Sequence, residues 1–158
     1  MTIVPPEVSL AILEGELPGA RRWAEDLGIT IRWDAEALSV CAEFVHPRSG
    51  DTFYLRGRFN EYRALPPVWE FCSADWGEAE KKEFYPKPVA GGTLFHPHGV
   101  ICAHFNRRAY RILGGPHGDW GDATQWTTVA KGYIKAHTLV DMLQAIHRDF
   151  PQTEGRMA

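Results

Sequence analysis

Four short stretches between residues 29 and 72 alternate apolar with polar residues, and this pattern limits the fold more than any other feature of the chain. They cover residues 29–33, 38–44, 53–59 and 68–72. Alternation with a period of two is typical of β-strands that bury one face. The segments 34–36 and 47–51, which link successive stretches, have turn-like composition. The pattern therefore predicts an antiparallel four-stranded meander.

Helical periodicity precedes the predicted sheet. A first run with leucines on one face ends where Pro18-Gly19 is expected to interrupt the helix. The period resumes over residues 20–27 and stops at Gly28, a residue suited to a helix C-cap. The leucines of the first run are Leu10, Leu13 and Leu17.

The last part of the chain predicts one long helix and little other regular structure. Residues 106–125 lack a clear period, so we expect a long loop over the active face with one short helix at Arg107–Ile112. From Thr138 onward the helical period is strong, Thr138 with Asp141 makes a start similar to a capping box, and Pro151 ends the helix. Its apolar stripe consists of Leu139, Leu143, Ile146 and Phe150. The fold class is α+β, with the N-terminal and C-terminal helices packed on one face of the sheet.

Composition limits the class of protein. The chain has 158 residues, which suits a single domain over residues 1–158, and its net charge of -3 gives no basic footprint for nucleic acid. No apolar run reaches the length that spans a membrane. Residues 1–7 lack the basic and apolar regions of a secretory signal, so we expect a cytoplasmic protein without nucleic-acid or membrane partners.

The three cysteines, Cys41, Cys72 and Cys102, are an odd number at wide spacings, which does not suit a disulfide framework. They predict free thiols in a reducing compartment. Cys41 lies within a predicted strand and Cys72 ends one, so both are interpreted as structural. Cys102 lies between the turn His96-Pro97-His98 and His104. A thiol flanked by imidazoles and loop backbone is placed to react.

Two segments carry the functional signal. The first runs from Tyr62 to Phe71 and contains the pair Pro66-Pro67, a rigid connector suited to the start of a strand. The second is His96-Pro97-His98-Gly99-Val100-Ile101-Cys102.

Together and in this order, these segments resemble the core of the ubiquitin-conjugating enzymes. That family has a Tyr, a Pro-Pro pair and a Phe at this spacing, then a His-Pro-Asn turn and a Gly-x-Ile-Cys run whose cysteine carries ubiquitin as a thioester. Trp126 and the helix after Thr138 stand where the family has a Trp and a following helix. The resemblance extends over roughly residues 8–150.

The resemblance implies a ubiquitin-conjugating-like fold and a transferase that needs no cofactor or metal. Cys102 would accept a ubiquitin-like protein from an activating enzyme and pass it to an amine of a target protein. The family's first helix docks the activating enzyme, which makes Arg21 and Arg22 candidates for partner binding. The departures from the family fit divergent bacterial relatives, which are often encoded in antiviral defence operons.

The chain has His98 where the family turn has Asn, the usual organiser of the oxyanion site. An imidazole N–H can donate a hydrogen bond to the oxyanion, so His98 is the first candidate donor, and Asn106 or His104 could replace it. His96 is a supporting candidate. Both turn histidines could equally serve only to hold the turn.

Three other interpretations stay open. Cys102 could be a small buried apolar residue, as most single cysteines are. The chain could be a non-catalytic binding module of the same fold for a ubiquitin-like partner. It could also be a small zinc protein, since metal-capable side chains gather at His96, His98, Cys102, His104 and His117.

Overall fold

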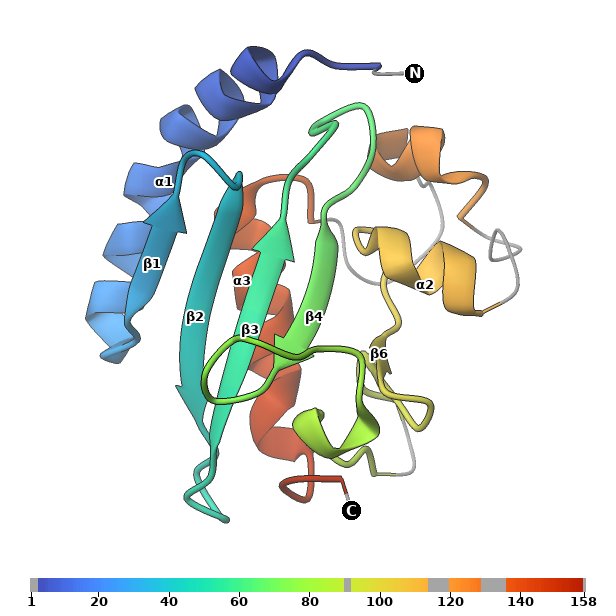
Figure 1. Ribbon diagram of the computed structural model, residues 1–158. Coiled ribbons are helices and arrows are strands. Elements are labelled where there is room, and N and C mark those ends of the chain that lie inside the picture. Colours follow the sequence, from blue (N-terminus) through green and yellow to red (C-terminus); the bar gives the residue numbers. More distant parts are fainter. Residues whose placement is uncertain (1–2, 90–91, 114–119, 129–135, 158) are drawn as a thin grey trace.

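The computed structural model describes residues 3–89, 92–113, 120–128 and 136–157. Four strands form one antiparallel sheet whose spatial order follows the chain (Figure 1). They are β1 Ile31–Asp34, β2 Ser39–Val45, β3 Thr52–Arg58 and β4 Val68–Cys72. The predicted meander is confirmed, and β4 has the predicted bounds.

The two faces of the sheet differ, as the alternation predicts. The inner face is apolar and buried, and includes Val40, Phe44, Phe53, Leu55, Trp69 and Phe71. On the outer face, Arg32, Cys41, Arg56 and Glu70 stand opposite one another across the four strands. The carboxylate of Glu70 is buried there between Arg56 at 3.6 Å and Arg58 at 3.2 Å.

Helix α1 is a single helix, Pro6–Leu27, so the predicted interruption at Pro18-Gly19 is wrong. Pro18 lies on the exposed side of the helix, where the carbonyl left without its usual donor can reach water. The opposite side stays buried without a break through Leu17 and Ala20. Burial of this continuous stripe outweighs the local preference of proline. The predicted C-cap at Gly28 is confirmed, since its φ is 70°.

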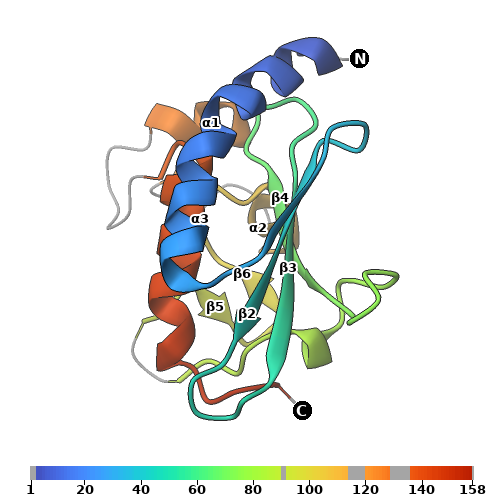
Figure 2. The ribbon, with the colours of Figure 1, turned by 90° about the vertical axis from the view of Figure 1, so that its left-hand side faces the viewer.

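Helix α3, Leu139–Asp149, lies on the same face of the sheet as α1 and packs beside it (Figure 2). The hydroxyl oxygen of Thr138 accepts the Asp141 N–H at 3.4 Å, which confirms the predicted cap. The four residues of the predicted apolar stripe are buried. A short 3-10 helix, η3 Phe150–Gln152, takes the chain past Pro151.

The chain between the sheet and α3 contains short elements: η1 Lys82–Phe84, β5 Phe95–His96, β6 Val100–Ile101, α2 Arg107–Ile112 and η2 Ala123–Thr128. Helix α2 has the predicted bounds, whereas residues 114–119 of the predicted loop lie outside the described residues. Strands β5 and β6 form an antiparallel hairpin that the sequence did not predict. Strands of two residues are too short to show periodicity.

Most buried apolar side chains form one cluster between the sheet and the two long helices. A smaller cluster beside β6 and α2 contains Val100, Ala109, Tyr110 and Trp120. None of the helices in the described parts of the chain combines the length and apolar character that crossing a bilayer requires.

Candidate active site

The His-Pro-His-Gly segment is the turn of the β5–β6 hairpin. The Gly99 N–H donates to the His96 carbonyl at 2.9 Å, which closes the turn. Gly99 has a φ of 77°, a conformation that glycine adopts without steric cost. A Cβ atom at this position would also lie 3.3 Å from Cα of Lys82 in η1. Glycine is therefore favoured here both by the backbone conformation and by the close approach of Lys82.

Cys102 directly follows β6 and is half-buried. Its backbone N–H donates to the Leu94 carbonyl at 2.6 Å, and its side chain borders the small apolar cluster of Tyr110 and Trp120. The other two cysteines lie in the sheet, where burial raises the pKa of Cys41 and raises that of Cys72 to about 11. Because the thiolate is the nucleophile, those two thiols are poorly suited to react.

His96 and His98 stack on each other at the tip of the hairpin. Their ring centroids are 4.8 Å apart, with 13° between the planes, and Nδ1 of His96 accepts the backbone N–H of His98 at 3.2 Å. Burial, and to a smaller degree His98, lowers the pKa of His96. The His98 ring is exposed and has an N–H that can serve an incoming group.

His104 points into the main core instead of toward solvent. Its ring is buried and lies edge-on to the ring of His137, with centroids 6.0 Å apart. Burial, helped by His137, lowers the pKa of His104 to about 4. The Nε2 atoms of both rings are buried without a hydrogen-bond partner among the described residues.

Asn106 is fully buried and joins three elements through its side-chain amide. Oδ1 accepts the N–H of Trp69 in β4 at 2.9 Å and the N–H of Arg108 in α2 at 3.2 Å. Nδ2 donates to the carbonyl of Ile101 in β6 at 2.9 Å. These bonds occupy the amide inside the protein. His98 lies in the turn at the tip of the hairpin, whereas Cys102 pairs with Leu94 at its base.

The two segments that carry the sequence resemblance are joined at this point. The Arg107 backbone N–H donates to the Pro67 carbonyl at 2.9 Å, and its Nε donates to the Pro66 carbonyl at 2.9 Å. The Asn106 bond to Trp69 lies next to these contacts. Sequence reasoning missed Arg107, because an arginine that bonds backbone carbonyls leaves no recognisable motif.

Trp126 lies in η2 and is fully buried in the main core. Its indole N–H donates to the Arg63 carbonyl at 3.0 Å, and its ring packs near Tyr62 and His137. Trp126 thus supports the segment that leads into β4.

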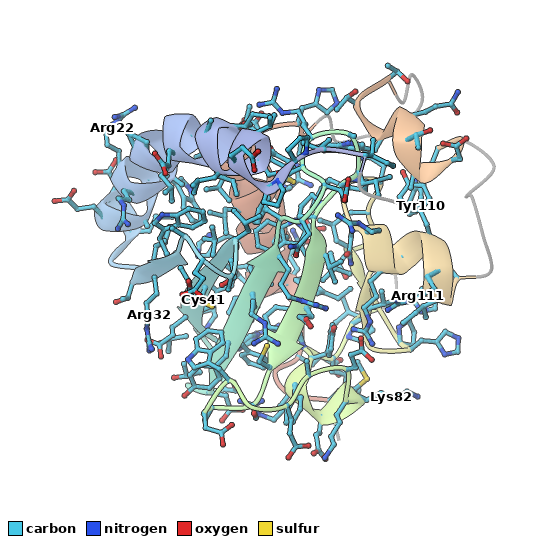
Figure 3. All side chains as sticks on the ribbon, turned by 45° about the horizontal axis from the view of Figure 1, so that its top comes forward. Arg22, Arg32, Cys41, Lys82, Tyr110 and Arg111 are labelled. Atoms are coloured by element: carbon cyan, nitrogen blue, oxygen red, sulfur yellow. The ribbon has the colours of Figure 1, made fainter. Side chains whose placement is uncertain are left out.

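Arg21 and Arg22 are exposed on α1. Figure 3 shows Arg22 on the opposite side of the molecule from Tyr110 and Arg111, so the fold does not bring these arginines to the hairpin. Arg21 borders a hollow of about 310 Å³ formed with Ala24, Glu25, Ile29 and Ile31. A larger hollow of about 710 Å³ lies on the outer face of the sheet, where Arg32 and Cys41 are labelled in Figure 3.

The zinc interpretation gains no support from the described part of the chain. There, no three side chains of the His, Cys, Asp or Glu type are grouped so that they could hold a metal ion. His117, the fifth candidate ligand, lies outside the described residues.

Comparisons with protein-family models, with curated proteins and with solved structures find no match to this chain.

Proposed function

We propose that this protein is a ubiquitin-conjugating-like enzyme that carries a ubiquitin-like protein as a thioester on Cys102. The observation that carries the proposal is the junction of its two motif segments. Arg107 binds the carbonyls of Pro66 and Pro67, and Asn106 binds both β4 and the strand before Cys102. This junction holds the half-buried Cys102 directly after a Pro-containing hairpin.

The order of elements supports a ubiquitin-conjugating-like fold. A long helix, a four-stranded antiparallel meander, a Pro-containing turn before a cysteine and a C-terminal helix follow one another as in that family. Helices α1 and α3 share one face of the sheet (Figure 2). Cys102 borders the small apolar cluster beside α2, and Leu94, whose carbonyl accepts its N–H, donates its own N–H to Asp149 at the end of α3 at 2.9 Å.

The proposed reaction has two transfers. The Cys102 thiolate attacks the thioester carbonyl carbon of the loaded activating enzyme, a new C–S bond forms, and the enzyme's own thiolate leaves. A target amine then attacks the new thioester, a C–N bond forms, the amine loses a proton, and the Cys102 thiolate leaves. Each tetrahedral intermediate carries an oxyanion, for which the exposed His98 ring can supply an N–H.

The proposed partners are a ubiquitin-like protein, its activating enzyme and a target protein. Arg21 and Arg22, which are exposed on α1, are proposed to contact the activating enzyme. The gene is proposed to belong to a bacterial defence operon, and the protein to act in the cytoplasm. Arg22 lies on the opposite side of the molecule from Arg111 of α2 (Figure 3), which fits a docking role.

The test is incubation of the protein with ATP and with activating enzyme and ubiquitin-like protein from the genes that flank its own. We expect an adduct that reducing agent cleaves, because a thioester is labile to thiols and an amide is not. Cys102→Ser should give an adduct that resists reduction, and Cys102→Ala should give none. Cys41→Ser and Cys72→Ser are the matched controls and should keep the labile adduct.

An adduct that still forms with Cys102→Ala would contradict the proposal. Stable binding of the ubiquitin-like protein without any adduct would support the binding-module alternative instead.

A further inference from the structure

The peptide unit between Ile101 and Cys102 is held at both ends. Its carbonyl oxygen accepts Nδ2–H of Asn106 at 2.9 Å, and its N–H donates to the Leu94 carbonyl at 2.6 Å. A peptide unit is planar, so two bonds on opposite edges fix the orientation of the whole plane. The Cα atom of Cys102 belongs to that plane, and its position is fixed with it.

From this arrangement we infer that Asn106 is a positioning residue for Cys102, an inference that rests on the proposed function. Asn106 anchors the Ile101 carbonyl to two rigid elements, because its Oδ1 accepts one N–H from β4 and one from α2. The side chain is fully buried, so water cannot take over the lost bonds if it is removed.

An asparagine is suited to this place because one side chain must both accept and donate. The two backbone N–H groups face one atom and the backbone carbonyl faces the other, which fixes the orientation of the amide. An aspartate would keep the acceptor for Trp69 and Arg108, and aspartate is also a good N-cap for α2. It would replace the donor to Ile101 with a carboxylate oxygen, which repels that carbonyl. Asn106→Asp therefore separates the link to the thiol from the support of β4 and α2.

The test uses iodoacetamide, which alkylates thiols without any protein partner, and peptide mass spectrometry to follow each cysteine. Asn106→Asp should speed alkylation of Cys102 roughly three- to tenfold, the change in local opening expected for one lost hydrogen bond. Cys72 is buried in β4 and reports global opening, so its alkylation rate should not change. Loading of Cys102 with a ubiquitin-like protein should fall at the same time, because a mobile thiol is poorly oriented.

Equal acceleration at Cys102 and Cys72 would show that Asn106 only stabilises the fold, and no change at Cys102 would show that it does not position the thiol. Either result overturns the inference. Asn106→Ser, which keeps a capping oxygen but cannot reach Ile101, provides a second variant if the first does not fold. Thr138→Ala is the stability control, because it removes the cap of α3 and should leave the Cys102 rate unchanged.

The alkylation result does not depend on conjugation. If Cys102 never forms a thioester but Asn106→Asp still speeds its alkylation alone, the proposed function fails and the positioning of the thiol stands. If thioester forms normally in both proteins, the positioning role fails and the proposed function stands.

Discussion

The Tyr62 hydroxyl donates a hydrogen bond to Oε1 of Glu16 at 2.9 Å, which connects the first motif segment to α1. The same carboxylate oxygen accepts the N–H of Leu139 at 2.7 Å, the first residue of α3. Tyr62 itself is fully buried. A residue of the motif therefore stabilises the meeting point of α1, α3 and the segment before β4.

Replacement of Tyr62 by phenylalanine should lower the free energy of unfolding by about 1–3 kcal/mol, because a mostly buried carboxylate loses a donor. Urea unfolding measures the change. Tyr54→Phe is the control, since the Tyr54 hydroxyl has no hydrogen bond among the described residues and its loss should have little effect. Equal effects of the two changes would contradict the role of Glu16.

The close approach of Lys82 to Gly99 predicts an unequal effect of alanine at two glycines. Gly50 and Gly99 have φ values of 75° and 77°, so Gly50→Ala should cost about 1–2 kcal/mol through backbone conformation alone. Gly99→Ala should cost about 1–3 kcal/mol more, because its Cβ meets Lys82 whereas nothing lies within 4 Å at Gly50. Thermal or urea unfolding of both variants measures the two losses of stability. Equal losses would show that η1 shifts to make room for the added methyl group.

The burial of His104 predicts that stability falls in acid. Its folded-state pKa of about 4 lies below its ordinary value of 6.5, so the unfolded chain binds more protons between these two values. The contribution of His104 to stability is therefore complete above pH 6.5 and is lost as the pH falls toward 4. The loss is at most about 3–4 kcal/mol, at about 1.4 kcal/mol per pKa unit.

The measurement is urea unfolding of the parent protein and of His104→Phe at several pH values from 7 to 4. Burial also lowers the pKa values of His96 and His147, so the parent alone would not isolate His104. The difference between parent and variant should shrink, or change in favour of the variant, as the pH falls. A difference that is independent of pH would contradict the prediction.

The exposed ring of His98 predicts a defect in transfer and not in folding. Loss of one oxyanion donor lowers rates by about 10²–10³ in other enzymes, so His98→Ala should slow discharge of the Cys102 thioester to free lysine by a comparable factor. The melting temperature should stay close to that of the parent. His96→Ala is the control and should slow discharge less. Full activity of His98→Ala would show that His98 is not the oxyanion donor.

Charge reversal at Arg21 and Arg22 should slow loading by the activating enzyme, because both side chains are exposed on α1. The effect should weaken as salt screens the charges. Time courses of Cys102 loading at low and high salt, with samples quenched at intervals, measure the effect. Identical loading of parent and variant at low salt would exclude this surface from docking.

The sequence alone determined the four strands of the meander, the cap of α3 and the bounds of α2, because these depend on periodicity and on residues only a few positions apart. Alternation across 29–72 is a local signal, and so is the pairing of Thr138 with Asp141. The same local reasoning failed at Pro18, where burial of a stripe against a distant part of the chain keeps α1 continuous.

The tertiary structure decided the surroundings of the candidate site residues. His98, His104 and Asn106 are equally polar in the sequence, yet one is exposed, one is buried against His137, and one is bonded to three elements. Burial and hydrogen bonding depend on which segments distant in sequence meet, here β4, β6 and α2. No local pattern records that meeting, so the bonds that hold the peptide unit before Cys102 could be found only in three dimensions.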